Sequence, residues 1–318
     1  MPQALAKGDG VSRLFWYKRG AVLMQDFIIT QKNNIWWGMF PRLAQAGFGN
    51  ACSCRLHGES SLVPGTLNLA LHVGDDAELV LQNRRLFAQA LGLDASKFTT
   101  CEQVHGSNVA VVDKALIGAG ATALADTIKD TDALVTNLAT VPLLLFFADC
   151  VPLLFADERQ GVCAVAHAGW RGTVAQIGRK TVEAMQQSFG SRPADIVAAI
   201  GPSIGQCCYE VDDFVRSKAA GYEQFFAPRA ENPGKYLLDL WGYNRQVLLD
   251  AGLKAENILT AGVCTEHNHE MFCSYRAEQG KTGRMGVCLY RMSAGKMRKY
   301  GRNASCNAKN TKRVSEDA

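Results

Sequence analysis

Three residues of this chain combine a suitable side chain with a suitable position to hold a metal ion: His105, Cys150 and His167. His105 precedes a predicted strand, Cys150 lies at the turn between two predicted strands, and His167 follows an apolar strand. Strand ends suit such ligands because the sheet fixes the backbone while the adjoining loops leave access. Two imidazoles and one thiolate fit Zn²⁺ or copper, and three protein ligands leave a fourth position for water or substrate. The sequence therefore predicts a single transition-metal ion in an open site.

The residues that follow His167 have the features of an anion site. A helix is predicted to begin at Thr173, because Thr173 and Gln176 match a capping box. The free N–H groups and the positive end of such a helix attract anions, and Arg171 adds a fixed cation. Trp170 offers an aromatic face on which a base or a sugar could stack, although packing in the core explains this residue equally well.

A second group of metal-binding residue types lies nearer the C-terminal end, in the order Cys264, His267, His269, Cys273. Its spacing matches no common zinc motif. We interpret this segment as a loop with incidental histidines rather than as a second metal site.

Apolar runs rich in Val, Leu, Ile and Phe predict the strands of a sheet that is covered on both faces. These strands are expected at residues 108–112, 133–136, 142–147, 151–155, 162–166, 196–200, 258–263 and 285–290. One helix is expected to begin at Asp75 or Asp76 and to stop at Gly92, and another lies within residues 239–252. With the helix at Thr173, this mixture indicates an α+β fold with helices outside a buried sheet layer.

The 318-residue chain is 47% hydrophobic and 20% charged, which excludes a disordered chain and a solvated coiled coil. Its net charge of +4 comes from the two ends, because residues 1–45 and 295–318 are basic while the stretch between them is acidic. A nucleic-acid-binding domain would carry Lys and Arg on its folded surface instead. We expect a peripheral N-terminal arm at residues 1–45, a catalytic domain at residues 46–292 and a disordered basic tail at residues 293–318.

The cysteines indicate a reducing compartment. There are eleven, an odd number, and their spacing suggests no disulfide framework. The N-terminal segment lacks the apolar stretch of a signal peptide, because Lys18, Arg19 and Asp26 interrupt it. The longest apolar run, residues 139–156, contains two prolines and an aspartate, so it predicts two strands around a turn rather than a membrane span. We therefore expect a cytoplasmic protein that binds neither membranes nor nucleic acid.

Eight stretches of the chain together resemble the laccase-domain family, whose members are described as multicopper polyphenol oxidases, purine nucleoside phosphorylases and the peptidoglycan editing factor. They are residues 53–60, 68–75, 102–106, 148–150, 167–172, 200–205, 274–276 and 282–285. The VHG, ADC and HAGWRG motifs among them are highly specific in combination. The resemblance implies a metal site, usually described as zinc, at His105, Cys150 and His167. It also implies a single domain of packed mixed β-sheets with outer helices, similar to the toxin-like cysteine deamidases.

The activity that the resemblance implies is phosphorolysis of adenosine, inosine and methylthioadenosine, with adenosine deamination beside it. The partners would be a purine nucleoside and inorganic phosphate. Four residues in family motifs are expected to line the pocket and to bind substrate or phosphate: Arg55, His72, Gln103 and Arg171. A structural ion pair explains Arg55 equally well, and a turn cap explains His72 equally well. Asp149 is expected to orient a metal ligand or a water molecule, and Asp75 to cap a helix.

Two positions depart from the family pattern. His57 stands where the family usually has Gly, and Cys273 stands where it usually has Phe. These departures affect the expected shape of the pocket and leave the expected metal ligands unchanged.

Other functions compete with this interpretation. A hydrolase that acts in peptidoglycan precursor editing would use Cys150 as nucleophile, with His105 or His167 as base. A copper-dependent polyphenol oxidase would need a trinuclear cluster built almost wholly of further histidines, and only four of the six remain for it. A binding module would use the basic tail. Metal content separates the hydrolase from a zinc enzyme, because a thiolate held tightly by zinc is poorly available for attack. It also separates the oxidase, which needs copper.

Overall fold

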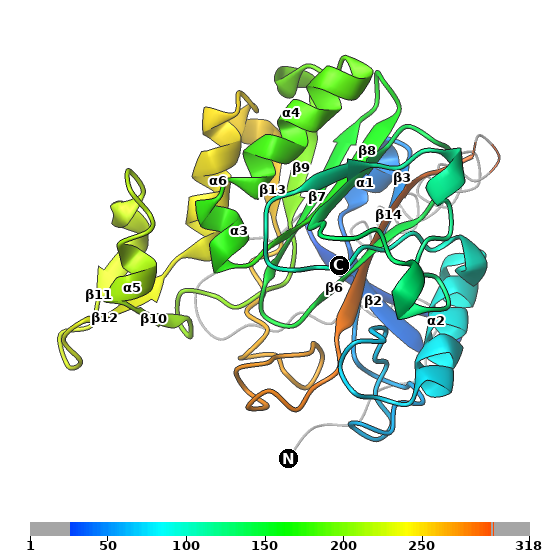
Figure 1. Cartoon of the computed structure of the whole chain (residues 1–318), viewed down its shortest axis with the longest axis horizontal. Coiled ribbons are helices and arrows are strands. Elements are labelled where there is room, and N and C mark those ends of the chain that lie inside the picture. Colours follow the sequence, from blue (N-terminus) through cyan, green and yellow to red (C-terminus); the bar gives the residue numbers. More distant parts are fainter. Residues whose placement is uncertain (1–25, 294, 296–318) are drawn as a thin grey trace, which may run out of the picture.

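Two large sheets form the centre of the computed structural model, which describes residues 26–293 and residue 295 (Figure 1). The five-stranded sheet is antiparallel, in the order β1 (Ile28–Lys32), β2 (Ile35–Met39), β3 (Phe48–Ser53), β14 (Met285–Arg291), β6 (Leu143–Phe147). The six-stranded sheet is mixed, in the order β13 (Ile258–Thr260), β9 (Val197–Ile200), β7 (Val151–Asp157), β8 (Val162–Ala168), β5 (Ala133–Thr136), β4 (Val109–Val111). A small antiparallel sheet of β10 (Glu210–Asp212), β12 (Lys235–Leu238) and β11 (Phe226–Pro228) lies to one side of the body.

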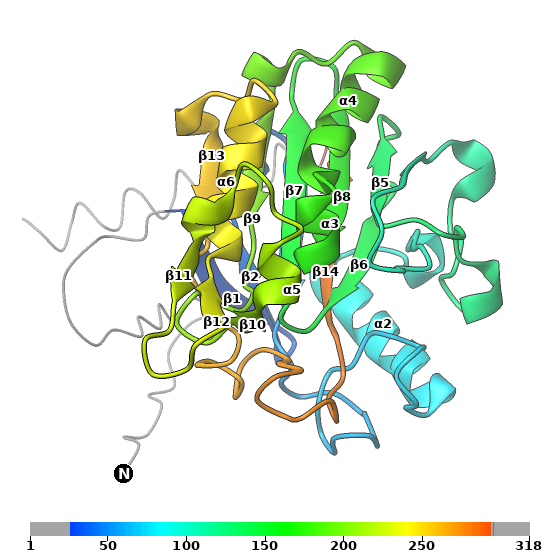
Figure 2. The same ribbon diagram turned by 60° about the vertical axis from the view of Figure 1, so that its left-hand side comes forward.

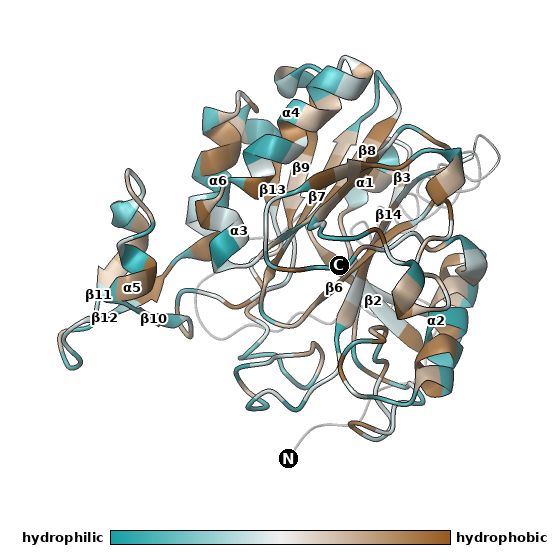
Figure 3. Ribbon diagram, viewed as in Figure 1, coloured by the Kyte–Doolittle hydropathy of each residue, from teal (hydrophilic) through white to brown (hydrophobic). Residues whose placement is uncertain are grey.

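The described residues form six α-helices. They are α1 (Pro41–Gln45), α2 (Ala77–Leu91), α3 (Trp170–Val174), α4 (Ile177–Phe189), α5 (Asp213–Arg216) and α6 (Leu240–Asp250), of which α5 packs on the small sheet. Helices α4 and α6 pack on the six-stranded sheet, as Figure 2 shows, whereas α2 packs on the five-stranded sheet. The helices turn polar surfaces outward, while the strands between them are mostly apolar (Figure 3). The result is a single α+β domain, as the sequence predicts.

Alternation along the strands produces the two sides of this sheet layer. On β8, Cys163 and Val165 face the five-stranded sheet, and Ala164 and Ala166 face the helices. Because both faces of each central strand are buried, the strands form continuous apolar runs in the sequence. All eight predicted strands are confirmed, as β4, β5, β6, β7, β8, β9, β13 and β14, with ends that differ by up to three residues.

Two of the three predicted helices are confirmed. Helix α2 has Asp76 as its N-cap, whose carboxylate accepts from two backbone N–H groups, and Gly92 as a left-handed C-cap. Helix α6 has Asp239 as its N-cap. Asp75, the other candidate cap, instead accepts hydrogen bonds from the loop at Ser60 and Ser61.

The predicted capping box at Thr173 is wrong. Thr173 lies inside the short helix α3, where its buried hydroxyl accepts a hydrogen bond of 2.9 Å from Asn244 of α6. Gln176 has a left-handed backbone with φ of 57° and separates α3 from α4, and its side chain caps neither helix. The chain thus makes a one-turn helix, a break and then the long helix, instead of one helix from residue 173.

Part of the predicted N-terminal arm belongs to the folded body. Residues 28–45 form β1, β2 and α1, and Phe40 and Leu43 are fully buried. The remainder of the arm, residues 1–25, and the predicted disordered tail beyond residue 295 lie outside the described residues. Across the part of the chain that the structure describes, no helix is both long enough and apolar enough to cross a membrane.

Candidate metal centre

Strand register brings the three predicted ligands to one edge of the six-stranded sheet. The antiparallel pairing of β7 with β8 sets Pro152 opposite His167, so Cys150, just before β7, lies beside the end of β8. The pairing of β5 with β8 sets Ala133 opposite Ala166. Strand β4 runs parallel to β5, which places the loop that carries His105, just before β4, at the same edge.

His105, Cys150 and His167 converge as the sequence predicts. Their potential ligand atoms all lie within 4.8 Å of one another, and the two imidazole rings meet edge to face with centroids 4.7 Å apart. His167 is buried, Cys150 is half-buried and His105 is exposed. The group therefore has a closed side within the protein and a side that solvent reaches.

Asp132, at the start of β5, organises this group. Its carboxylate lies 2.8 Å from His167 Nδ1, and both residues are buried. The same carboxylate accepts the backbone N–H groups of Val104, His105 and Gly106, at 3.2, 3.1 and 2.7 Å. A carboxylate at Nδ1 favours the tautomer that leaves Nε2 free to bind a metal. One buried side chain thus fixes both the orientation of His167 and the loop that carries His105.

Local backbone conformation also serves the convergence. His105 has a left-handed backbone with φ of 60°, and Asp149 has φ of 78°. Residues other than Gly rarely adopt such positive φ angles. Gly169 approaches the group closely, because a Cβ atom there would lie 3.0 Å from Cys150 Sγ and 3.1 Å from His105 Cδ2. Glycine is therefore required on steric grounds at this position of the HAGW segment, because the side chain of any larger residue would enter the space between the ligands.

The electrostatics of the group favour an ionised thiol. Burial opposes ionisation of Cys150, but the imidazoles of His167 and His105 outweigh it and lower the pKa of the thiol to about 6. Burial also disfavours a charged His167, yet Cys150 and Asp132 raise the pKa of its imidazole to about 9. A thiolate with two imidazoles is a donor set that zinc and copper bind, so these residues fit the predicted metal.

Asp149, which is expected to orient a metal ligand or a water molecule, contacts two loops in the structure. Its carboxylate accepts the hydroxyl of Thr265 at 2.6 Å and the backbone N–H of Arg276 at 2.7 Å, while its carbonyl accepts the N–H of Ile204 at 2.9 Å. These contacts tie two long loops to the segment that carries Cys150. Asp149 therefore holds the walls of the site, and Asp132 is the residue that orients a candidate ligand.

The segment after His167 is only partly as expected. Helix α3 has just five residues, and α4 starts inside the core, where Gly178 packs against Leu153 and Leu248. The expected helix terminus for an anion at Thr173 is therefore absent, since the break at Gln176 divides the helix. Arg171 is exposed beside the site, with its guanidinium 4.4 Å from the centroid of the Trp170 ring. One face of Trp170 is thus occupied by a cation, and the residue also packs against the core of the helical layer.

The other expected pocket residues have structural partners. The amide of Gln103 donates to the carbonyl of Phe146 and accepts its N–H, both at 2.8 Å, which pins the His105 loop to β6. Arg55 is buried, forms an ion pair of 2.7 Å with Glu278 and donates to the carbonyl of His269. His72 is exposed, and its ring lies 6.0 Å from that of Phe146.

The two departures from the family pattern differ in their surroundings. His57 has a left-handed backbone with φ of 59°, which is the conformation that favours Gly. Cys273 is buried, and burial raises the pKa of its thiol to about 11. Cys273 is therefore an inert core residue and takes no part in a cluster with Cys264 and His267.

Sequence reasoning missed Asp132, Tyr209 and Arg284. Burial raises the pKa of Tyr209, and the charges that also act on its hydroxyl include those of Cys150 and Arg171. Burial lowers the pKa of Arg284, the charge of Cys150 opposes this shift, and the guanidinium donates to the carbonyls of Thr282 and Gly283. Tyr209 and Arg284 lie near or within the motifs at residues 200–205 and 282–285, so the motifs pointed to their neighbourhood. Asp132 lies in none of the motifs and becomes visible only through strand register.

We expect Asp132→Asn to lower metal affinity at this site by about 10- to 100-fold, the usual cost of losing a carboxylate behind a ligating histidine. An amide has one acceptor where the carboxylate has two, so its NH₂ group would face backbone N–H groups. Competition against a chelator of known affinity measures the change. Asp130→Asn is the matched control, because Asp130 is exposed and its carboxylate contacts only the side chain of Asn108. Equal affinity in both variants would contradict the role of Asp132.

Comparison with known proteins identifies the family of this chain. A family model described as multi-copper polyphenol oxidoreductase laccase matches residues 49–291. The chain is 39% identical over 266 residues to "Purine nucleoside phosphorylase YlmD" of Bacillus subtilis, an alignment that covers 83% of this chain and 92% of that protein. It is 37% identical over 228 residues to "Adenosine deaminase RL5" of an unknown prokaryotic organism, which covers 71% of this chain and 86% of that protein.

The fold has solved counterparts. The crystal structure of YlmD from Geobacillus stearothermophilus superposes with a TM-score of 0.78 at 37% identity, covering 83% of this chain and 99% of that one. The crystal structure of the Bacillus licheniformis protein YfiH superposes with a TM-score of 0.77 at 33% identity, covering 82% of this chain and 97% of that one. Through the match of residues 49–291, the chain belongs to the multi-copper polyphenol oxidoreductase laccase family.

Proposed function

We propose that this protein is a zinc-dependent purine nucleoside phosphorylase that acts on adenosine, inosine and methylthioadenosine, with adenosine deamination as a side activity. The observation that carries the proposal is the convergence of His105, Cys150 and His167 within 4.8 Å, with one side open to solvent. Relatives at 39% and 37% identity are named as a purine nucleoside phosphorylase and an adenosine deaminase. Because one thiolate and two imidazoles suit zinc, we assign this metal to the site.

The residues of the site would divide the work of the reaction. A bound zinc ion would supply a Lewis acid at the open position. Asp132 holds the proton on His167 Nδ1 and keeps Nε2 directed at the site. Gln103 and Asp132 hold the His105 loop, and Asp149 holds the loops opposite. Such fixed positions favour catalysis because the groups need little rearrangement when the substrates meet.

Phosphate needs a cation beside the sugar. In phosphorolysis a phosphate oxygen bonds to C1′ of the ribose, the bond from C1′ to the purine nitrogen breaks, and the purine leaves with a proton. Arg171 is exposed at the end of the HAGW segment, next to the close approach of Gly169 to Cys150. Arg284 is a second arginine whose charge interacts with that of Cys150, and its Nη1 donates to the carbonyls of Thr282 and Gly283. A guanidinium group binds phosphate through two parallel N–H···O hydrogen bonds, so we assign phosphate to this side of the site.

We expect Arg171→Ala to raise the KM for phosphate by about 10- to 100-fold, the value of one hydrogen bond to a charged group. The KM for adenosine should change far less, because the purine has no charge for Arg171 to bind. Steady-state kinetics with each substrate varied in turn measures the two effects. Arg85→Ala, which removes an exposed arginine from α2, should leave both values unchanged. If the variant at residue 171 instead impairs nucleoside binding and keeps its use of phosphate, the assignments of the two substrates must be exchanged.

A hydrolase that uses Cys150 as nucleophile is the second candidate function. The observation in its favour is the convergence of Cys150 with His105 and His167, whose imidazoles lower the pKa of the thiol to about 6 despite burial. A substrate from peptidoglycan precursors would suit this function. The copper oxidase has less support, because the two groups of three or more potential metal ligands among residues 26–293 include no cluster built of histidines.

The test of the proposal is whether zinc-loaded protein converts adenosine to adenine and ribose phosphate only when inorganic phosphate is present.

A further inference from the structure

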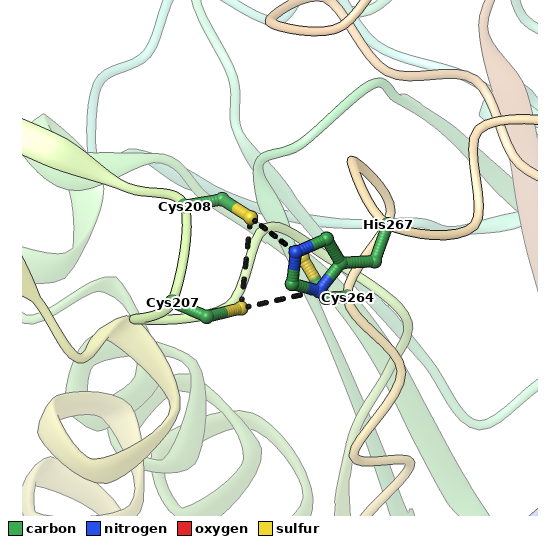
Figure 4. Close-up of side chains that lie close together, drawn as sticks. All are labelled: Cys207, Cys208, Cys264 and His267. Atoms are coloured by element: carbon green, nitrogen blue, oxygen red, sulfur yellow. Dashed lines mark hydrogen bonds between the residues drawn. The ribbon is translucent and has the colours of Figure 1, made fainter. Parts of the chain in front are cut away.

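Four metal-binding side chains converge at a second place, outside the centre described above. Cys207, Cys208, Cys264 and His267 have potential ligand atoms that all lie within 4.8 Å of one another. Figure 4 shows the ring of His267 between the cysteine sulfurs, with Cys207 Sγ 3.6 Å from Nδ1 and Cys208 Sγ 3.3 Å from Nε2. The two adjacent sulfurs lie 3.6 Å apart, and all three cysteines are free thiols.

The fold brings these residues together from two loops that are distant in sequence. Cys207 and Cys208 follow β9, and Cys264 and His267 follow β13. Because β9 and β13 are parallel neighbours, the loops that follow them leave the same edge of the sheet. A further bridge between Ser203 and Cys264 extends this pairing into the loops. The spacing within residues 264–273 could therefore not indicate the cluster, because two of its four members come from the other loop.

The local chemistry is that of a structural zinc site. Three thiols and one imidazole form a Cys₃His set, which binds zinc as four tetrahedral ligands without an open position. The backbone N–H of Gly205 donates to Cys264 Sγ at 3.3 Å, and a hydrogen bond of this kind favours the thiolate that a metal needs. Cys207 and His267 are exposed, so an ion can reach the cluster from solvent, while Cys264 is buried at its base.

We propose that Cys207, Cys208, Cys264 and His267 bind a second zinc ion, which is structural and fastens the loop after β9 to the loop after β13. This proposal is independent of the reaction assigned to the first centre. It replaces our interpretation of His267 as an incidental loop histidine, whereas His269 and Cys273 stay outside the site.

The position of the site indicates what the ion stabilises. Thr265, next to Cys264, donates to the carboxylate of Asp149. Arg276 donates from its guanidinium to the carbonyl of Cys208 at 3.1 Å and from its backbone N–H to Asp149 at 2.7 Å. Asp149 directly precedes Cys150 of the first centre. An ion in the second site would therefore hold both loops in the positions that brace the catalytic segment, and it would anchor the small sheet that starts at Glu210.

Metal analysis of protein purified without added chelator tests the proposal. We expect two zinc ions per chain in the wild type and one in each of His267→Ala and Cys264→Ser. His269→Ala is the matched control, because His269 is exposed on the same loop and its ring contacts only the carbonyl of Glu266. It should keep both ions. The proposal is overturned if His267→Ala and Cys264→Ser bind as much zinc as the wild type.

Cobalt substitution identifies the ligands of the second ion. In the Cys150→Ala background the first centre has no thiolate, so absorption from thiolate-to-cobalt charge transfer must come from the second site. We expect this band in Cys150→Ala and its loss when Cys264→Ser is added. Absence of the band in fully reduced, cobalt-loaded Cys150→Ala protein would overturn the proposal.

A measurement on the wild type covers the case in which these variants fail to fold. Zinc-loaded protein and protein stripped by a chelator are treated with an alkylating reagent, and the modified peptides are identified by mass spectrometry. Cys207, Cys208 and Cys264 should be protected in the zinc-loaded protein and modified after stripping. Equal modification in the two samples, or a disulfide among these cysteines in freshly isolated protein, would refute the site.

Discussion

Replacing Cys150 by Ala should remove the metal from the first centre and reduce phosphorolysis by at least about a hundredfold. Four-ligand zinc sites contribute roughly 10–16 kcal/mol, so one ligand contributes roughly 3 kcal/mol, or about two orders of magnitude in affinity. The thiolate also neutralises part of the charge of the metal, which two neutral imidazoles leave uncompensated. The buried carboxylate of Asp132 does not replace it, because its oxygens are already engaged by His167 and by backbone N–H groups.

Metal content and activity are measured together in this variant. The Cys150→Ala protein is expected to retain only the ion held by Cys207, Cys208, Cys264 and His267, so its zinc content should fall from two ions to one. Cys163→Ala is the matched control, because Cys163 is a buried thiol of β8, four residues before His167. It removes a sulfur atom from the same sheet at a cost of about 1 kcal/mol in stability and should keep both ions. A Cys150→Ala protein with the zinc content of the wild type would disprove the assignment of Cys150 as a ligand.

The sequence predicted the central strands well because each is buried on both faces. The runs that became β6, β7 and β8 contain little but apolar residues, and runs of this kind that are too short to span a membrane predict buried strands. The first hairpin has a sequence signal of another kind, in its turn. Asn33 and Asn34 have φ of 52° and 64°, as a two-residue type I′ turn requires, and they join β1 to β2. Asn-Asn between two short apolar segments could have indicated this hairpin.

The three candidate ligands could be predicted from the sequence, whereas the residues that hold them in place could not. His105, Cys150 and His167 stood out because each is a rare residue at a strand end. Asp132 is an ordinary acidic residue in a polar segment, and only the pairing of β5 with β8 places it behind His167. The second cluster was concealed for the same reason, since the adjacent Cys207 and Cys208 gain meaning only when β9 and β13 prove to be parallel neighbours. Register is a long-range property, and one sequence without its fold does not reveal it.

The helix after His167 shows the limit of local signals. Thr173 and Gln176 have the spacing of a capping box, and the apolar residues that follow have helical periodicity. Tertiary contacts prevent the capping box, because the hydroxyl of Thr173 accepts a hydrogen bond from Asn244 and the backbone of Gln176 is left-handed. The phosphate site that we propose consequently depends on arginine side chains and not on that helix.

Incubation of adenosine with the zinc-loaded protein should yield adenine and ribose phosphate at a rate that rises with added phosphate until it saturates, with no adenine when phosphate is omitted. Phosphate is the nucleophile of this reaction, so no adenine forms by phosphorolysis without it. Positioning of the two bound substrates can lower the barrier by roughly 7–11 kcal/mol. Deamination, measured as release of ammonia, should be slower and should not depend on phosphate, because water replaces the amino group.

The same assay separates the competing functions. A hydrolase that uses Cys150 would release no sugar phosphate, and alkylation of Cys150 would inactivate it even in protein stripped of metal. A polyphenol oxidase would consume oxygen, require added copper and ignore phosphate. A phosphorylase must lose activity when the metal is removed and regain it with zinc, and Arg171→Ala must shift its dependence on phosphate to higher concentrations. If the zinc-loaded protein leaves adenosine, inosine and methylthioadenosine untouched at every phosphate concentration, the phosphorylase assignment fails. The hydrolase that uses Cys150 as nucleophile is then the function to test next, with a peptidoglycan precursor as substrate.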